Sequence, residues 1–328
     1  MTHPRSAFGA PPPGGAASGP AAPGPRRPLA EAVPSRRRAM GMLAACALPA
    51  LATAAQAAEP LKVVASFSLL ADMVAQVGGD AVAVHALVGP DADAHAFTPA
   101  PADAQRLAQA GLIVVNGLGF EGWLDRLVRA SGSKAPVVVA SQGIAVRRIG
   151  KVSDPHAWQS LVAAQRYVEN IRAALVAARP AQAAAINARA ADYSARLAAL
   201  DASVRGRLAA IPPGERKLVT SHDAFGYMAD AWGLDMRAAQ GWTTAGDASA
   251  ADVARLIRQL KAQKVRALFV ENISDPRLVE RIAREAGATV GGTLYSDALS
   301  PPGSRADTYL KLMAHNADTL LAALQPAR

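Results

Sequence analysis

The chain has 328 residues, 51% of them hydrophobic, which is enough for one large domain or two domains of ordinary size. Its formal net charge of +9 is unevenly spread, because residues 1–58 hold six arginines against one acid, Glu31, and supply +5 of the total. The remainder carries +4 and has no basic cluster with interleaved aromatic residues, which argues against nucleic-acid binding.

The start of the chain has the features of an export signal. Residues 1–34 are rich in proline, glycine and alanine, a composition typical of disordered chain. Three arginines then precede an apolar run that ends in the small residues Ala55 and Ala57, which fit signal-peptidase cleavage before Ala58. The run is too short and too rich in alanine for a membrane span. We therefore predict a disordered extension plus signal peptide over 1–57 and a periplasmic mature protein, with both the general secretory and the twin-arginine routes open.

Cys46 is the only cysteine, which excludes a disulfide within the chain and a zinc site built on cysteines. It ends the stretch Leu43–Cys46, which matches a short lipoprotein motif. The apolar run continues beyond it to Ala57, so we favour simple cleavage over a lipid anchor at Cys46. A buried alanine-rich helix is the alternative to export.

From Leu61 the sequence alternates between short apolar runs and amphipathic segments. The apolar runs are typical of buried strands and the amphipathic segments of helices. This alternation predicts a parallel sheet covered by helices. The expected strands are 61–67, 82–89, 112–117 and 135–141, and the expected helices are 69–79, 102–111 and 122–132.

The pattern changes in the middle of the chain, where helix-favouring residues run from Ala157 to Ala210 with an interruption at Pro180. Two helices are expected, over 157–178 and 181–210, and the second would be about 45 Å long at about 1.5 Å per residue. The strand and helix alternation then resumes. Its expected strands are 217–221, a short one near Met236, 265–271 and 288–295, and its expected helices are 224–233, 249–263, 275–287 and 306–324.

The predicted fold is therefore α/β, with two parallel-sheet lobes joined by a long helix. The expected boundaries are 58–180 for the N-terminal lobe, 181–210 for the linker helix and 211–328 for the C-terminal lobe.

Three of the six histidines are set aside, because His3 lies in the leader, His85 inside a strand and His315 on the last helix. The other three and one aspartate lie in loops at strand ends or helix starts, the edge at which α/β sheets bind ligands. Two of these four precede the long helix and two follow it, so a shared site must lie between the lobes. Three imidazoles and one carboxylate suit a borderline divalent metal, although no local HExxH or CxxC motif is present and a structural role for each stays open. The four are His95, His156, His222 and Asp297.

A resemblance adds to this pattern. The stretches that carry it run in order from Leu61 to Leu324: DAHAFTPAPAD, NGLGFEGWLDRL, SDPHAWQ, VTSHDAFGYMADAWGLD, FVENISDPRLVERIAREAGA, LYSDALSPPG and TYLKLMAHNADTL. With them the chain resembles the metal-binding solute receptors of ABC importers that take zinc and manganese, and most of all the zinc members. The resemblance implies two lobes joined by a rigid helix, a metal in the cleft, and the ligands His95, His156, His222 and Asp297.

Two departures from the family pattern bear on the site. Gln159 and Ser160 stand where many members continue DPHxW with LDP, so the bonding around the helix start is open. Residues 131–153 also contain no histidine, so the long histidine-rich loop of many zinc members is missing from this region. Nearby, Asp223 is expected either to orient an imidazole or to be solvated, Glu271 mainly to be structural, and the tryptophans Trp123 and Trp158 to pack.

The predicted function is a periplasmic zinc receptor that delivers the ion to an ABC permease, with a manganese receptor as the alternative. In the family that the chain resembles, manganese receptors tend to have a carboxylate at the position of His222, where this chain has an imidazole. A metal-dependent hydrolase is less favoured, because a fourth protein ligand at Asp297 would fill the position that catalytic zinc keeps for water. A serine hydrolase lacks GxSxG, and nothing specific favours an adhesin. We expect a monomer, and a metallochaperone is an open second partner.

Overall fold

The computed structural model describes residues 59–244, 249–263, 265 and 267–325. The predicted leader over 1–57, with Cys46 and the cleavage site, lies outside the described residues. Among the helices that are described, none combines the length and the apolar character needed to cross a membrane.

The first half of the structure is a four-stranded parallel sheet in the order β2-β1-β3-β4. The central strand β1 has consecutive residues, Val63 to Phe67, buried on both faces, as expected where helices cover a parallel sheet. Its elements are β1 (Leu61–Phe67), α1 (Ser68–Gly78), β2 (Val82–Val88), α2 (Pro101–Ala108), β3 (Leu112–Val115), α3 (Leu124–Ser131) and β4 (Val137–Val139).

The connection after β4 differs from the prediction in two ways. A small antiparallel hairpin, β5 (Arg148–Ile149) with β6 (Val152–Ser153), was not predicted. The helix expected from 157 is interrupted at its first turn, because a 3₁₀ turn ends at Ser160 and the Ser160 hydroxyl then accepts a hydrogen bond from Ala163 N and caps the next helix. That helix is α4 (Leu161–Ala178).

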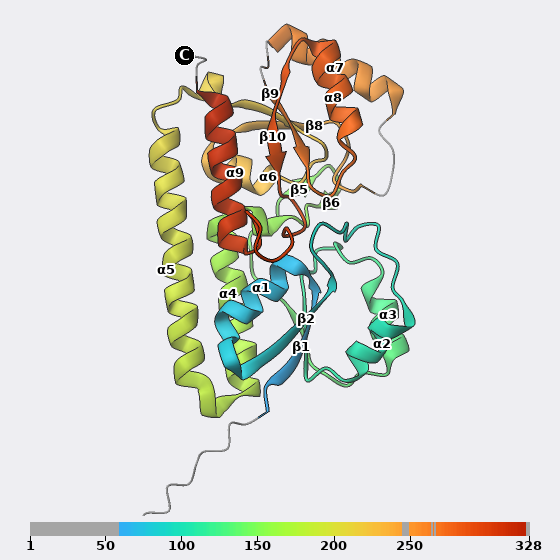
Figure 1. Cartoon of the computed structure of the whole chain (residues 1–328), viewed down its shortest axis with the longest axis vertical. Helices are drawn as coiled ribbons and strands as arrows, with labels where there is room; N and C mark the ends of the chain where they lie inside the picture. The colour runs from blue at the N-terminus through green and yellow to red at the C-terminus, as the bar shows by residue number, and fades with distance from the viewer. Residues whose placement is uncertain (1–58, 245–248, 264, 266, 326–328) are drawn as a thin grey trace, which may run out of the picture. The chain divides into compact units, whose positions relative to one another are not determined.

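The long helix is α5 (Ala183–Leu208), which packs against α1 and α4 of the first half of the fold and against α9 and α6 of the second. Figure 1 shows it running beside α4 and α9. Its buried residues recur every three or four positions, so they form one buried stripe along the helix, apolar apart from Asp201. They are Ile186, Ala190, Tyr193, Leu197, Asp201, Val204 and Leu208.

The second half is another four-stranded parallel sheet, in the order β10-β9-β7-β8. A large apolar core extends through both halves, and a smaller cluster lies under α7 and α8. The predicted fold class, two parallel-sheet lobes with a long helix, is confirmed; the boundaries at 58, 181 and 211 stay predictions. The elements are β7 (Lys217–Thr220), α6 (Gly226–Trp232), β8 (Asp235–Ala238), α7 (Ala250–Gln263), β9 (Ala267–Glu271), α8 (Pro276–Ala286), β10 (Thr289–Leu294) and α9 (Tyr309–Leu324).

Candidate metal centre

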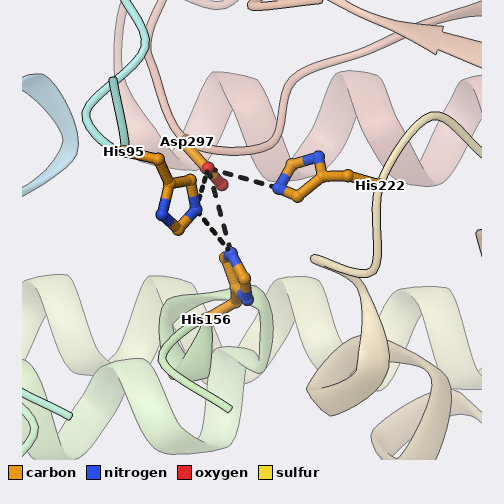
Figure 2. A group of neighbouring side chains, drawn as sticks. All are labelled: His95, His156, His222 and Asp297. Atoms are coloured by element: carbon orange, nitrogen blue, oxygen red, sulfur yellow. Dashed lines mark hydrogen bonds and ion pairs between the residues drawn. The ribbon is translucent and has the colours of Figure 1, made fainter. Parts of the chain in front are cut away.

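The four residues singled out from the sequence come together at one point, with one potential ligand atom from each lying within 4.8 Å of every other. Figure 2 shows their side chains pointing toward one another. His95 comes from the loop after β2, and His156 from the turn between β6 and α4. His222 lies two residues after the end of β7, and Asp297 lies in the loop after β10. Both halves of the fold therefore contribute two residues each.

The spacing of these atoms is that of ligands around one small ion. Nε2 of His95 lies 3.2 Å from Nε2 of His156 and 3.2 Å from Oδ2 of Asp297. The same Oδ2 lies 3.4 Å from Nε2 of His222 and 3.9 Å from Nε2 of His156. In a tetrahedral zinc site with bonds of about 2.0–2.1 Å, neighbouring ligand atoms lie about 3.3 Å apart.

The centre is closed to solvent, and within the described part of the chain its one carboxylate ligand lacks well-formed hydrogen bonds. The side chain of His95 is 3% exposed and those of the other three are fully buried. Among the described residues, neither carboxylate oxygen of Asp297 accepts a well-formed hydrogen bond, and three imidazole nitrogens face it. A buried carboxylate needs a cation or several donors, and a metal ion would satisfy this one.

His156 is held by Asp154, two residues before it. Oδ1 of Asp154 accepts a hydrogen bond from the backbone N of His156 at 3.0 Å and lies 2.8 Å from ring Nδ1. Because a carboxylate only accepts hydrogen bonds, Nδ1 carries the proton and Nε2 is left as the metal-binding nitrogen.

His222 is held by Glu271, at the end of the neighbouring strand β9, which uses a separate oxygen for each of its two contacts. Oε1 of Glu271 accepts from the backbone N of His222 at 2.8 Å, and Oε2 lies 2.6 Å from ring Nδ1. Glu271 thus orients the imidazole and directs its Nε2 toward Asp297.

The other two residues are positioned through their backbones. Oδ1 of Asp93 accepts from the backbone N of His95 at 2.8 Å. The segment of Asp297 is held by Trp158 and Gln159, which both donate to Ser296 O, at 2.9 and 2.7 Å. Gln159, a departure from the family pattern, therefore bonds from the first half of the chain to the loop that carries Asp297.

Charge couples the two sides of the centre. Burial acts to raise the pKa of Asp297, but the charges of His156 and His222 outweigh it and hold this pKa well below its usual range. Burial acts to lower the pKa of His222, but the charges of Glu271 and Asp297 outweigh it and raise this pKa well above its ordinary value. Without a metal, therefore, His222 holds a proton close to an ionised Asp297.

The residues that orient the histidines differ from those considered in the sequence. Asp223 bonds through its backbone to Gly241 O and is not the carboxylate that holds His222. That residue is Glu271, expected to be mainly structural. Asp154 was not singled out from the sequence, although its place two residues before His156 was a usable signal. His85 and His315 do not lie at the centre. His315 Nε2 instead contacts Thr293 O.

The buried three-histidine, one-carboxylate centre between two α/β lobes defines a metal-binding protein of the solute-receptor class. The chain belongs to the family of the zinc-uptake complex component A, periplasmic, whose family model matches residues 63–323. Members of this family are solute-binding proteins of metal ABC transporters.

Individual relatives differ in the metal for which they are named. The chain is 32% identical over 277 residues to the manganese-binding lipoprotein MntA of Bacillus subtilis, covering 81% of this chain and 90% of the relative. It is 33% identical over 270 residues to the iron-binding protein YfeA of Yersinia pestis, covering 80% and 86%. The solved structure of the periplasmic zinc-binding protein TroA of Treponema pallidum matches with a TM-score of 0.78 and 31% identity, covering 81% of this chain and 100% of that one. The relatives therefore support metal binding and leave the metal open.

Proposed function

We propose that this protein is a periplasmic zinc receptor that delivers the ion to the membrane permease of an ABC importer. Its ligands are His95, His156, His222 and Asp297. The observation that carries the proposal is the convergence of three imidazole nitrogens on one unpartnered, buried carboxylate, at the spacing of a single ion's ligands.

Zinc is favoured by the kind of donor atoms in the centre. Three imidazoles and one carboxylate make a site that suits zinc, whereas manganese favours carboxylate, carbonyl and water oxygens. At nitrogen ligands divalent zinc also binds more strongly than manganese in general. Manganese remains the second candidate, because MntA, a relative of similar identity, is named as a manganese-binding protein.

A receptor fits the centre better than a hydrolase does. Catalytic zinc keeps one coordination position open for water, with three protein ligands. Here the fourth protein ligand is Asp297, which is buried together with the three histidines. A closed, fully protein-liganded site holds and releases an ion but has no place to activate water.

Delivery to a permease and residence in the periplasm complete the proposal. Both rest on the family and on the export features of residues 1–57, and cleavage before Ala58 is the form of export we favour. A mature protein that begins with an acylated Cys46 would contradict this cleavage. The monomeric state and the absence of nucleic-acid binding stay predictions, and a metallochaperone stays an open partner.

A competition titration of metal-free protein with zinc and manganese at neutral pH tests the choice of metal. We expect one zinc per chain, bound far more tightly than manganese. Manganese binding as tight as zinc binding would overturn zinc while leaving the four ligands in place. Failure to bind either metal would overturn the receptor itself.

The variant His222→Glu tests whether this histidine sets the preference. A second carboxylate makes the centre harder and more anionic, so the ratio of zinc affinity to manganese affinity should fall. Glu is longer than Asp and reaches as far as an imidazole, so the site should keep its four ligands. An unchanged ratio would show that His222 does not determine selectivity.

A further inference from the structure

Arg147 makes a contact that the proposed metal binding does not by itself require. It precedes β5 in the hairpin, and its Nη1 lies 2.9 Å from Oδ2 of Asp154. Asp154 is fully buried, and its other oxygen, Oδ1, faces Nδ1 of His156. One carboxylate therefore joins the arginine to a metal-binding histidine.

The backbone around Arg147 fixes this pairing from both sides. Asp154 N donates to Arg147 O at 2.9 Å, across the open end of the hairpin. Arg147 N donates at 2.8 Å to the hydroxyl of Tyr227, on α6 of the second half, and that hydroxyl donates to Asp154 O at 3.3 Å. The outer contact of the guanidinium, to the exposed carboxylate of Asp230 at 3.3 Å, is worth little by comparison.

The first residue of α6 is shaped to admit the guanidinium. A Cβ added at Gly226 would lie 2.2 Å from both Cζ and Nη1 of Arg147. Any side chain at 226 would therefore displace the arginine from its position. Gly226 has no left-handed backbone angle that requires glycine, so the close approach of Arg147 is the physical reason for glycine at this position.

The charges around the centre explain what the arginine contributes. Asp154, Glu271 and Asp297 are buried carboxylates, and Arg147 is the arginine that pairs with the first of them. The carboxylates of Asp223 and Asp230 also act on the charge of Arg147. Without Arg147, Oδ2 of Asp154 would be a buried charge without its partner, a costly state that the carboxylate relieves by rotating or by admitting water. Either change moves Oδ1 away from Nδ1 of His156.

We propose that Arg147 is a positioning residue of the metal centre, because through Asp154 it holds His156 in the orientation and tautomer that bind the ion. Gly226, which has no side chain, leaves the space that the guanidinium of Arg147 occupies. This inference rests on the proposed metal binding and adds to it a residue from outside the ligand set. It also makes α6, in the second half, part of the support of a ligand from the first half.

Zinc affinity, measured by competition with a chelator of known affinity, tests the proposal in two independent variants. Arg147→Met should weaken binding by about tenfold, the lower end of the range for residues that orient metal ligands. Gly226→Ala alters no charge and no ligand, yet should cause a similar loss by displacing the guanidinium. The double variant should bind no more weakly than Arg147→Met alone. Arg147→Lys should recover part of the loss, because it keeps the charge without the planar fork.

Two matched controls and one spectrum separate positioning from general stability. Arg148→Met removes the neighbouring exposed arginine of the same hairpin, and Gly206→Ala adds a Cβ where it meets nothing, so both should bind zinc as wild type does. The visible absorption of the cobalt(II)-substituted protein should change in Arg147→Met and Gly226→Ala and stay as in wild type in both controls. A lower melting temperature of metal-free Arg147→Met is expected, because Asp154 loses its partner, so the spectrum is the readout that distinguishes positioning.

Wild-type affinity and an unchanged cobalt spectrum in Arg147→Met would overturn the inference, as would a loss of melting temperature without a spectral change. These results leave the receptor intact as long as wild type binds zinc. Absence of zinc binding in wild type and in Arg148→Met would instead refute the proposed function.

Discussion

In each half of the metal centre, a buried carboxylate accepts a hydrogen bond from the backbone N of a histidine and lies against its ring Nδ1. The two carboxylates differ in how their oxygens are distributed among their partners. One oxygen of Asp154 contacts His156 and the other pairs with Arg147. Both oxygens of Glu271 contact His222. The negative charge of Asp154 therefore interacts with an arginine as well as with its histidine, whereas that of Glu271 interacts with its histidine.

This difference assigns different tasks to the two histidines. His222, with Glu271 behind it and Asp297 in front, has a raised pKa and holds a proton that an incoming ion must displace. His156 depends instead on the arrangement of the hairpin and α6 around Arg147. His222 and Glu271, in the second half, should therefore determine how metal affinity changes with pH. His156, in the first half, should make metal affinity depend on how the hairpin and α6 pack around Arg147.

The largest expected effect is the loss of a ligand. An ion that binds only the folded state stabilises it by about 2.7 kcal/mol at a free concentration of about one hundred times the dissociation constant. His222→Ala should remove most of that gain, measured as the zinc-induced increase in melting temperature. His85→Ala and His315→Ala are the controls and should keep it, because neither lies at the centre. A zinc-induced increase of wild-type size in His222→Ala would contradict the ligand assignment.

The position of the centre could be predicted from the sequence because His95, His222 and Asp297 each follow a strand whose apolar run is plain in the sequence. The carboxylates that orient the histidines, Asp154 and Glu271, could not be assigned from the sequence. Glu271 reaches His222 because β9 lies next to β7, while β8, which separates them along the chain, lies at the sheet edge. Sequence patterns identify strands but do not give their order in the sheet.

The support of His156 was missed for a different reason. The strands of the hairpin are two residues long, too short to show any periodicity. The role of Arg147 also depends on a contact with α6, some eighty residues further along the chain, which no local pattern encodes. The break at Ser160 was missed because helix-favouring residues continue through it, and only the capping hydrogen bond of its side chain reveals the new start.

The next effect compares the two carboxylates directly. Asp154→Asn and Glu271→Gln should each weaken zinc binding by about 10–100-fold, because each removes the acceptor that orients a histidine. Only Glu271→Gln should also lower the number of protons released when zinc binds at neutral pH, since Glu271 is, with Asp297, one of the two charges that raise the pKa of His222. Calorimetry in buffers of different ionisation enthalpy measures that number. An equal change in both variants would remove the distinction between the two halves.

The change of wild-type zinc affinity with pH is expected to be smaller, about tenfold per pH unit, than the loss caused by replacing either carboxylate. His222 has a raised pKa in the folded protein, so its protonation stabilises the metal-free form fully below the unfolded pKa of about 6.5 and ceases to do so as pH rises through the folded pKa. Asp297, whose pKa is lowered, stays ionised throughout this window. Zinc affinity should therefore rise by about tenfold per pH unit up to the pKa of His222, one proton being displaced per ion. Zinc titrations from pH 6 to pH 8 measure this slope, and an affinity that is flat over the range would show that His222 is already neutral.

The smallest expected effect is a change of shape on metal binding, because the halves are joined by more than one chain segment. Helix α5 packs on α1 and α4 of the first half and on α9 and α6 of the second, and a helix of this length is a stiff connection. Oδ2 of Asp72, on α1, also accepts from the backbone N of Tyr309 at the start of α9, at 2.8 Å. Small-angle scattering of wild type should give the same radius of gyration with and without zinc. Asp72→Ala removes the contact between α1 and α9 and leaves the ligands untouched, so any zinc-dependent change should be larger in this variant than in wild type. A large change in wild type itself would mean that the two halves separate when the ion leaves, and that α5 does not hold them.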